Sequence, residues 1–252
     1  MKLIKKLAIF ATFTAILTAC VTTAQINQEA ESNYAQVKQE ARAKSMLDTS
    51  STTAKRVHAV FNKMKPYAER ANKTGVPFQW EIVVLKSDEL NAWAMPGGKM
   101  AFYTGLVEKL RLSDDEIAVV MGHEMAHALQ EHGKSDRTVS AVTGIVGVLA
   151  DVAVTATTGV NTEGLLSTGV DLVAAKPFSR SQETEADEVG LMLMAESGYN
   201  PEAAPNVWVK MSQANGNAGL SIFSTHPSNE DRQENLARLV PKAKAIYNAN
   251  KK

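Results

Sequence analysis

The chain has 252 residues, of which 44% are hydrophobic and 21% are charged. This composition excludes a disordered or low-complexity protein and is sufficient for a core of ordinary size. The 27 basic and 27 acidic residues give a formal net charge of zero, so nothing in the charge balance indicates nucleic acid as a partner. We therefore expect a globular protein that does not bind nucleic acid.

The first 19 residues have the pattern of a secretory signal rather than of a folded segment. Lys2, Lys5 and Lys6 precede an apolar run over residues 7–17, and the sequence LTAC follows. A charged region, a short apolar region and small residues in this order are typical of a signal peptide. The apolar run is short for a membrane span, although an uncleaved N-terminal anchor is the alternative.

Cys20 is the only cysteine in the chain. The sequence LTAC resembles the bacterial lipobox, in which the cysteine becomes the lipidated first residue. A secreted protein with one cysteine cannot form an internal disulfide, so lipidation would also remove a stray thiol. Because Val21 stands where an aspartate typically marks inner-membrane retention, the resemblance implies a lipoprotein of the outer membrane, on its periplasmic face.

Residues 20–51 are polar and rich in Gln, Glu, Ala and Ser, and we interpret them as a lipidated tether with some helix. The main domain is then expected over residues 52–252. It begins with a predicted helix over 53–72, followed by a β-branched and aromatic segment over 78–87 that predicts a strand.

Two more strands are predicted around the sequence Pro96-Gly97-Gly98, which favours a turn. Asn91 to Met95 precede this turn, and residues 99–105 follow it. Since the remaining segments look helical, the expected fold class is α+β, mainly helical with a small antiparallel sheet.

The next helix opens with Ser113 and Glu116, which form an S-x-x-E capping box, and is expected to run to Gly133. Residues 138–156 are almost wholly apolar apart from Asp151. We interpret them as a buried or membrane-grazing helical hairpin, with a membrane span as the alternative.

Three further helices are predicted in the last third of the chain. One starts near residue 179 or 181 and ends at residue 198. Asn200-Pro201 opens the next, and the last covers residues 229–248.

Three of the five histidines lie in the stretch MGHEMAHALQEHG, residues 121–133. At about 100° per residue, His123 and His127 project side by side from a largely apolar helix, with Glu124 at the edge of the same stripe. Burying two imidazoles and a carboxylate without partners costs roughly several kcal/mol, and a shared metal ion removes that cost. His132 falls on the opposite side, so we predict that it is a helix cap and not a ligand.

The third ligand is expected on the helix that contains SRSQETEADEVG. Glu183 and Asp187 share one face with Gly190, whose missing side chain lets another helix approach. We predict that Glu183 binds the metal and that Asp187 accepts the ring N–H of a metal-bound histidine. The other acids of this helix are expected to face water: Glu185, Glu188 and Glu196. The alternative is that all five acids form a solvated face.

Four motifs in this order resemble those of the gluzincin metallopeptidases that include HtpX and the CAAX prenyl endopeptidase. They are NAWAMPGG, HEMAH, ETEAD about fifty residues later, and STHPSNEDR. The resemblance covers roughly residues 80–232. The motifs resemble in particular those of the periplasmic lipoprotein branch, the LoiP- and BepA-like proteins. We expect neither the transmembrane helices of HtpX nor the helical-repeat domain of the BepA branch.

This resemblance implies one zinc ion per chain, held between two active-site helices. His123, His127 and Glu183 would bind it, and Glu124 would be the catalytic carboxylate. An edge strand would bind an extended substrate as an additional strand. The residues of that strand are Asn91, Ala92, Trp93, Ala94 and Met95.

We therefore expect a zinc-dependent endopeptidase of the bacterial cell envelope that degrades misfolded or misassembled outer-membrane and periplasmic proteins. Zinc would lower the pKa of a water to about 7 and polarise the scissile carbonyl, and Glu124 would transfer the proton to the leaving amine. His226 or Arg232 would stabilise the oxyanion. The alternative is a chaperone or assembly factor for outer-membrane proteins with gated protease activity, in which His226 closes the zinc site.

Overall fold

The computed structural model describes residues 21–136, 177–215, 226 and 230–250. The chain divides into two units, and the larger one comprises Asn27–His132 and Pro177–Lys252. The proposed signal sequence, Cys20 and the apolar segment 138–156 lie outside the described residues. Within the described part of the chain, no helix is long and apolar enough to cross a membrane.

The sheet has three strands in the order β1-β3-β2. β1 is Glu81–Leu85, β2 is Ala92–Met95 and β3 is Lys99–Tyr103. β2 and β3 form an antiparallel pair around the short helix η1, Pro96–Gly98, in which Gly97 has a φ of 76°. β1, however, pairs with β3 in parallel. The prediction of an antiparallel sheet was wrong for this pair of strands. After β1 the chain passes to the opposite edge of the sheet and forms β2. β3 then returns between them and runs parallel to β1.

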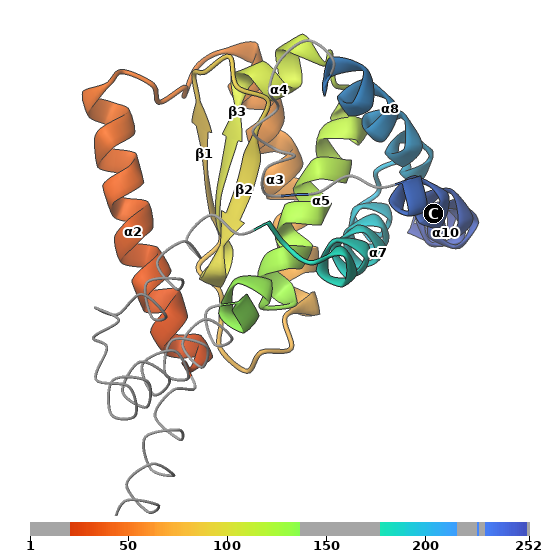
Figure 1. The fold of residues 1–252 in the computed structure, drawn as a ribbon, viewed down its shortest axis with the longest axis horizontal. Helices are drawn as coiled ribbons and strands as arrows, with labels where there is room; N and C mark the ends of the chain where they lie inside the picture. The colour runs from red at the N-terminus through yellow and green to blue at the C-terminus, as the bar shows by residue number, and fades with distance from the viewer. Residues whose placement is uncertain (1–20, 137–176, 216–225, 227–229, 251–252) are drawn as a thin grey trace, which may run out of the picture. The chain divides into compact units, whose positions relative to one another are not determined.

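The helix α2, Thr23–Ala43, covers one face of the sheet (Figure 1). The side chain of Tyr34 is fully buried there, and its hydroxyl donates to the Met100 carbonyl at 2.9 Å. Ala41 belongs to a second small apolar cluster on the same face. The helix expected within residues 20–51 is therefore present, but it packs on the sheet instead of serving as a tether. The composition is polar because most of this helix faces outward, and a few apolar residues are enough to dock it.

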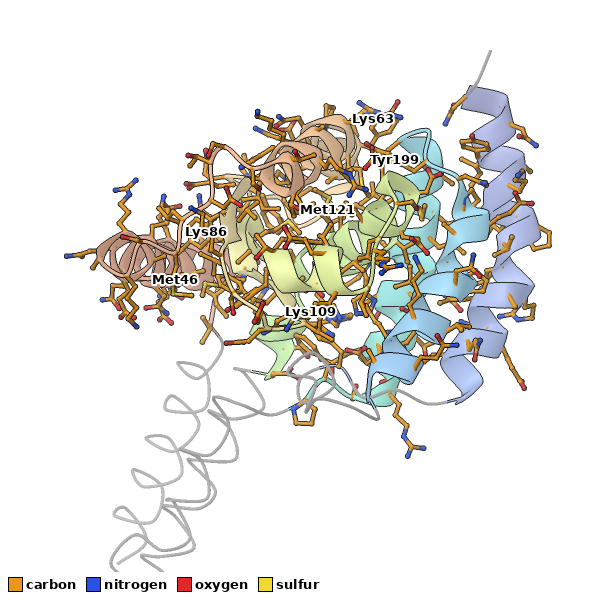
Figure 2. All side chains as sticks on the ribbon, turned by 90° about the horizontal axis from the view of Figure 1, so that it is seen from above. Met46, Lys63, Lys86, Lys109, Met121 and Tyr199 are labelled. Atoms are coloured by element: carbon orange, nitrogen blue, oxygen red, sulfur yellow. The ribbon has the colours of Figure 1, made fainter. Side chains whose placement is uncertain are left out.

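The remaining helices lie on the other side of the sheet (Figure 1). Their bounds are α3 Thr52–Ala71, α4 Thr104–Lys109, α5 Asp114–Leu129, α7 Arg180–Glu196, the short η3 Pro201–Ala203, α8 Ala204–Asn215 and α10 Glu230–Asn250. α5 lies at the centre and packs against α3, α7, α8 and β2. Every residue from Val120 to Leu129 is buried, so this helix has no solvated face in its second half. Figure 2 shows Met121 in the interior, whereas Lys86 and Lys109 lie nearer the surface.

α5 and α7 are in direct backbone contact. A Cβ atom at Gly190 would lie 2.6 Å from the carbonyl carbon of Gly122, and one at Gly122 would lie 2.6 Å from the Gly190 carbonyl oxygen. Neither distance is compatible with a side chain. This confirms the close approach that Gly190 predicted, and it brings the HEMAH and ETEAD segments face to face.

Candidate metal centre and active site

The three predicted metal ligands converge between α5 and α7. The Nε2 atoms of His123 and His127 lie 3.0 Å apart. Glu183 approaches both, with Oε1 at 3.3 Å from His127 Nε2 and Oε2 at 3.5 Å from His123 Nε2. Ligand atoms at about 2.0–2.1 Å from a tetrahedral zinc ion lie roughly 3.3 Å from one another, so the two nitrogens and the Glu183 oxygen nearest to each of them have the spacing of a zinc site.

The chemistry of this group also suits a cation. The outer nitrogen of His123, Nδ1, lies 2.9 Å from Asp187 Oδ1, and that of His127 lies 2.9 Å from His132 Nδ1. A neutral imidazole that donates from Nδ1 presents a lone pair at Nε2. Two such lone pairs then face each other and the fully buried carboxylate of Glu183. A metal ion resolves this repulsion, so the residues fit zinc.

Local sequence explains why these side chains meet. Ser113 and Ser179 each form a complete capping box, which fixes where α5 and α7 begin. Glu183 lies in the first turn of α7, where the helix dipole favours a negative charge. Burial raises the pKa of Glu183, but its close contacts with His123, His127 and His226 outweigh this effect and hold the pKa well below its usual range.

Arg232, on α10, supports the carboxylates from behind. Its Nη1 lies 2.5 Å from Glu183 Oε2, and its Nε and Nη2 donate to the two oxygens of Asp187 at 2.7 and 2.9 Å. Burial raises the pKa of Asp187, but the hydrogen bonds from Arg232 and His123 outweigh it and hold the pKa below its usual value. The expectation that Arg232 stabilises an oxyanion does not fit this position, because the guanidinium is already bound to both carboxylates.

His226 joins the same cluster. One nitrogen each of His123, His127 and His226 and one oxygen of Glu183 all lie within 4.8 Å of one another. His226 Nδ1 lies 3.0 Å from Glu183 Oε1 and 3.3 Å from His123 Nε2. The structure therefore places His226 where a fourth ligand would stand, and its role as ligand or oxyanion donor stays a prediction.

Glu124 lies beside this group, with Oε1 at 3.5 Å from His226 Nε2. Burial raises the pKa of its carboxyl group, against the opposing influence of His226 and His123. A carboxylate with a raised pKa is a better proton acceptor near neutral pH, as a general base must be. A backbone hydrogen bond from Ala94 connects Glu124 to β2.

β2 contains four of the five residues predicted to bind substrate, and Asn91 directly precedes it. β2 is an edge strand of the sheet, packed against α5. This is the position that addition of an extended peptide needs. Substrate binding by these residues stays a prediction.

His132 does not lie where the helical wheel placed it. α5 ends at Leu129, and Glu131 adopts a φ of 53°, which reverses the chain and returns His132 to His127. His132 Nε2 also lies 3.2 Å from Glu185 Oε2. The prediction of a helix cap on the opposite side was wrong, since it assumed that the helix continues to Gly133.

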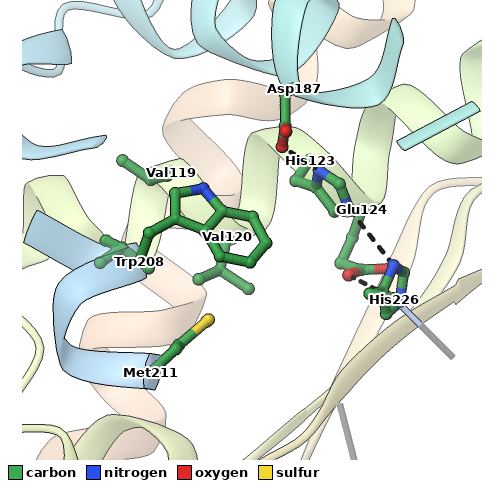
Figure 3. A pocket seen from close by; sticks show the side chains of 9 residues that line it. Val119, Val120, His123, Glu124, Asp187, Trp208, Met211 and His226 are labelled. Atoms are coloured by element: carbon green, nitrogen blue, oxygen red, sulfur yellow. Dashed lines mark hydrogen bonds and ion pairs between the residues drawn. The ribbon is translucent and has the colours of Figure 1, made fainter. Parts of the chain in front are cut away.

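An apolar pocket opens beside Glu124, and sequence analysis missed it (Figure 3). Its volume is about 30 Å³, or about 380 Å³ when the open space at its mouth is counted. Besides His123, Glu124, Asp187 and His226, it is lined by Val119 and Val120 of α5 and by Val207, Trp208 and Met211 of α8. The Arg232 guanidinium lies 4.0 Å from the Trp208 ring centroid. The sequence shows apolar residues at helical spacing in α8, but this spacing does not indicate whether they face the core or a pocket.

Comparison with known proteins extends this description. The sequence profile described as Peptidase family M48 matches residues 51–240. The chain is similar to mitochondrial metalloendopeptidase OMA1 of Arabidopsis thaliana, with 34% identity over 185 residues, 73% of this chain and 36% of that protein. It is similar to metalloprotease YcaL of Escherichia coli, with 26% identity over 263 residues, 97% of this chain and 100% of that protein.

Metalloprotease LoiP of Escherichia coli is 29% identical over 165 residues, 66% of this chain and 64% of that protein. The chain spans 36% to 49% of the length of the plant and yeast OMA1 proteins that it matches.

Proposed function

The chain belongs to peptidase family M48, and on that premise we propose that it is a zinc-dependent endopeptidase of the bacterial cell envelope. The observation that carries this proposal is the buried group of His123, His127 and Glu183 with the spacing of a zinc site and Glu124 beside it. A zinc ion in such a site supplies Lewis acidity, which acidifies water and polarises a carbonyl.

The chain's own residues provide the remaining chemistry. Glu124 takes the proton of the attacking water and delivers it to the leaving amine. Asp187 holds the His123 ring through Nδ1, and Arg232 in turn holds Asp187. Since these partners are buried, the ligand geometry is fixed before substrate arrives.

Two features of the site favour an unfolded polypeptide as substrate. The edge strand β2 offers main-chain hydrogen bonds to an extended chain. The apolar pocket beside Glu124 suits a small hydrophobic side chain, which a folded protein keeps buried. Both properties support the degradation of misfolded or misassembled proteins of the outer membrane and periplasm.

The location in the envelope rests on the N-terminal sequence. Residues 1–19 have the pattern of a signal peptide and LTAC resembles a lipobox, so we propose lipidation of Cys20 and attachment to the outer membrane on its periplasmic face. A Cys20→Ala variant should accumulate as an unprocessed precursor or leave the membrane fraction. Normal fractionation of this variant with the outer membrane contradicts the proposal.

The activity is tested by casein digestion with the purified protein and with Glu124→Gln. The variant should bind one zinc ion per chain and unfold at the wild-type temperature, but should not cleave casein. Cleavage at the wild-type rate by Glu124→Gln would contradict the role of Glu124 as the general base.

A second candidate is a chaperone or assembly factor with gated protease activity. The position of His226 favours it, since four protein ligands are typical of a closed zinc site. The two functions separate in one assay, because a chaperone suppresses aggregation of an unfolded outer-membrane protein even as Glu124→Gln. If the protein is only an endopeptidase, Glu124→Gln should no longer prevent aggregation of the unfolded outer-membrane protein.

A further inference from the structure

We propose that His132 and Glu185 form a hydrogen-bonded chain that fixes which nitrogen of His127 faces the metal. The inference rests on the zinc site of the proposed function but not on proteolysis. It concerns a positioning role, because neither residue belongs to the ligand group or lines the pocket.

The chain of contacts runs from the surface of α7 to the metal site. Glu185 is about half exposed, and its Oε2 lies 3.2 Å from His132 Nε2. His132 itself is buried, and its Nδ1 lies 2.9 Å from His127 Nδ1. The other ring nitrogen of His127 is the one that points at His123 and Glu183.

The carboxylate gives this chain a direction. A carboxylate only accepts hydrogen bonds, so the His132 nitrogen that faces Glu185 carries the proton. In its neutral form His132 has a single N–H, and its Nδ1 is then an acceptor. His127 must then donate from Nδ1, which leaves the Nε2 lone pair for the metal. Without Glu185, His132 can carry its proton on Nδ1 instead. His127 is then no longer restricted to the tautomer that has its proton on Nδ1 and its lone pair on Nε2.

The backbone is shaped to make this contact. Glu131 adopts a positive φ of 53°, which is unfavourable for a residue with a side chain. A glycine, the residue that usually ends a helix in this conformation, stands only two positions later at Gly133. Such strain persists where the surroundings require it, and here its consequence is that His132 returns to His127.

The neighbouring contacts of His127 leave this role to His132. The Phe178 ring stacks on the His127 imidazole with centroids 4.0 Å apart and an interplanar angle of 24°. Stacking restricts the plane of the imidazole but does not distinguish its two nitrogens. For His123, the tautomer is selected by Asp187, which contacts Nδ1 and is held in place by Arg232. The two zinc-binding histidines are thus oriented by different partners.

The test is the zinc affinity of the full protein, measured by competition with a chelator. His132→Leu should weaken zinc binding by roughly 10- to 100-fold, as loss of such a partner does in other sites. His132→Asn should bind zinc nearly as well as the wild type, because its side-chain oxygen can accept from His127 Nδ1. Glu185→Ala should weaken binding in the same direction but less.

Glu188→Ala is the matched control, since Glu188 is a half-exposed glutamate of the same helix that pairs with Asn235. It should leave the affinity unchanged. The unfolding temperature of each metal-free variant is measured in parallel. If His132→Leu lowers that temperature but keeps the zinc affinity, or if His132→Asn binds as weakly as His132→Leu, the positioning role is overturned.

Two outcomes separate this inference from the proposed function. If the wild type binds no zinc, the proposed function fails. If the wild type binds zinc and Glu185→Ala binds it equally well, only the inference fails. Because the Glu185 side chain is half exposed, this variant should fold even where His132→Leu does not.

Discussion

Gly122 of α5 and Gly190 of α7 lie so close that a Cβ atom on Gly190 would stand 2.6 Å from the carbonyl carbon of Gly122. The atoms that a new side chain would meet belong to the backbone of α5, next to the ligand His123. The separation of the two helices, and with it the size of the metal site, therefore depends on these glycines.

Gly190→Ala should destabilise the protein and weaken zinc binding. Alanine in a helix gains about 0.5–1 kcal/mol over glycine, but overpacking costs about 1–3 kcal/mol where neighbours cannot move, so the clash should dominate. Chemical unfolding and chelator competition measure the two effects. A variant with wild-type zinc affinity and higher stability would show that the helices do not need this contact.

Asp187→Asn should lower the free energy of unfolding of the metal-free protein by about 2 kcal/mol at neutral pH, since it weakens the charged hydrogen bonds from Arg232 and the close contact with His123. The pKa of Asp187 lies below its ordinary value of 3.8. Its stabilising effect is therefore fully present above that pH and is lost as the pH falls through the folded-state pKa.

The difference between the wild type and Asp187→Asn should shrink accordingly as unfolding is measured at progressively lower pH. Glu196→Gln, which changes an exposed acid of the same helix, should show no comparable difference. A gap between wild type and Asp187→Asn that stays constant down to the acid limit contradicts the assigned role of the carboxylate.

Val119→Phe should reduce cleavage of casein while leaving the zinc content unchanged. Val119 lines the apolar pocket and is only partly buried, so the larger side chain can fill the space meant for substrate. Val209→Phe is the matched control, because Val209 lies on α8 but is 40% exposed and does not line the pocket. Equal activity of the two variants would exclude the pocket from substrate binding.

His226→Ala should raise the basal rate of cleavage if His226 closes the zinc site, as its distances to Glu183 and His123 favour. If His226 instead donates to the oxyanion, the same substitution lowers turnover with little change in zinc content. Turnover and zinc are measured together on one preparation. No change in either quantity would rule out both roles.

The parts of the site that sequence could predict are those set by local periodicity. The i, i+4 spacing of His123 and His127 and the shared face of Glu183 and Asp187 follow from helix geometry alone. Gly190 indicated the close approach of a second helix, and the structure confirms it. Strand, turn and strand around the sequence Pro96-Gly97-Gly98 were also predicted, because turn residues and β-branched residues act locally.

The parts that sequence could not predict depend on where elements end and on what they face. His132 was misplaced because α5 ends at Leu129, four residues before the glycine that was taken as its end. α2 was interpreted as a tether because four buried apolar residues in a polar helix carry little signal: Ile26, Ala30, Tyr34 and Ala41. Arg232 acts on Glu183 from α10, a contact between distant segments that no local pattern records.

The central claim is that one zinc ion, held by His123, His127 and Glu183, is required for peptide cleavage. The most direct measurement follows zinc content and casein cleavage together, before chelation, after chelation and after return of zinc. The wild type should hold one zinc ion per chain, lose cleavage with the metal and regain both. Glu183→Ala should hold no zinc and cleave nothing at any stage, while Glu188→Ala follows the wild type. Cleavage that persists without zinc, or a Glu183→Ala variant that retains both zinc and activity, would contradict the account.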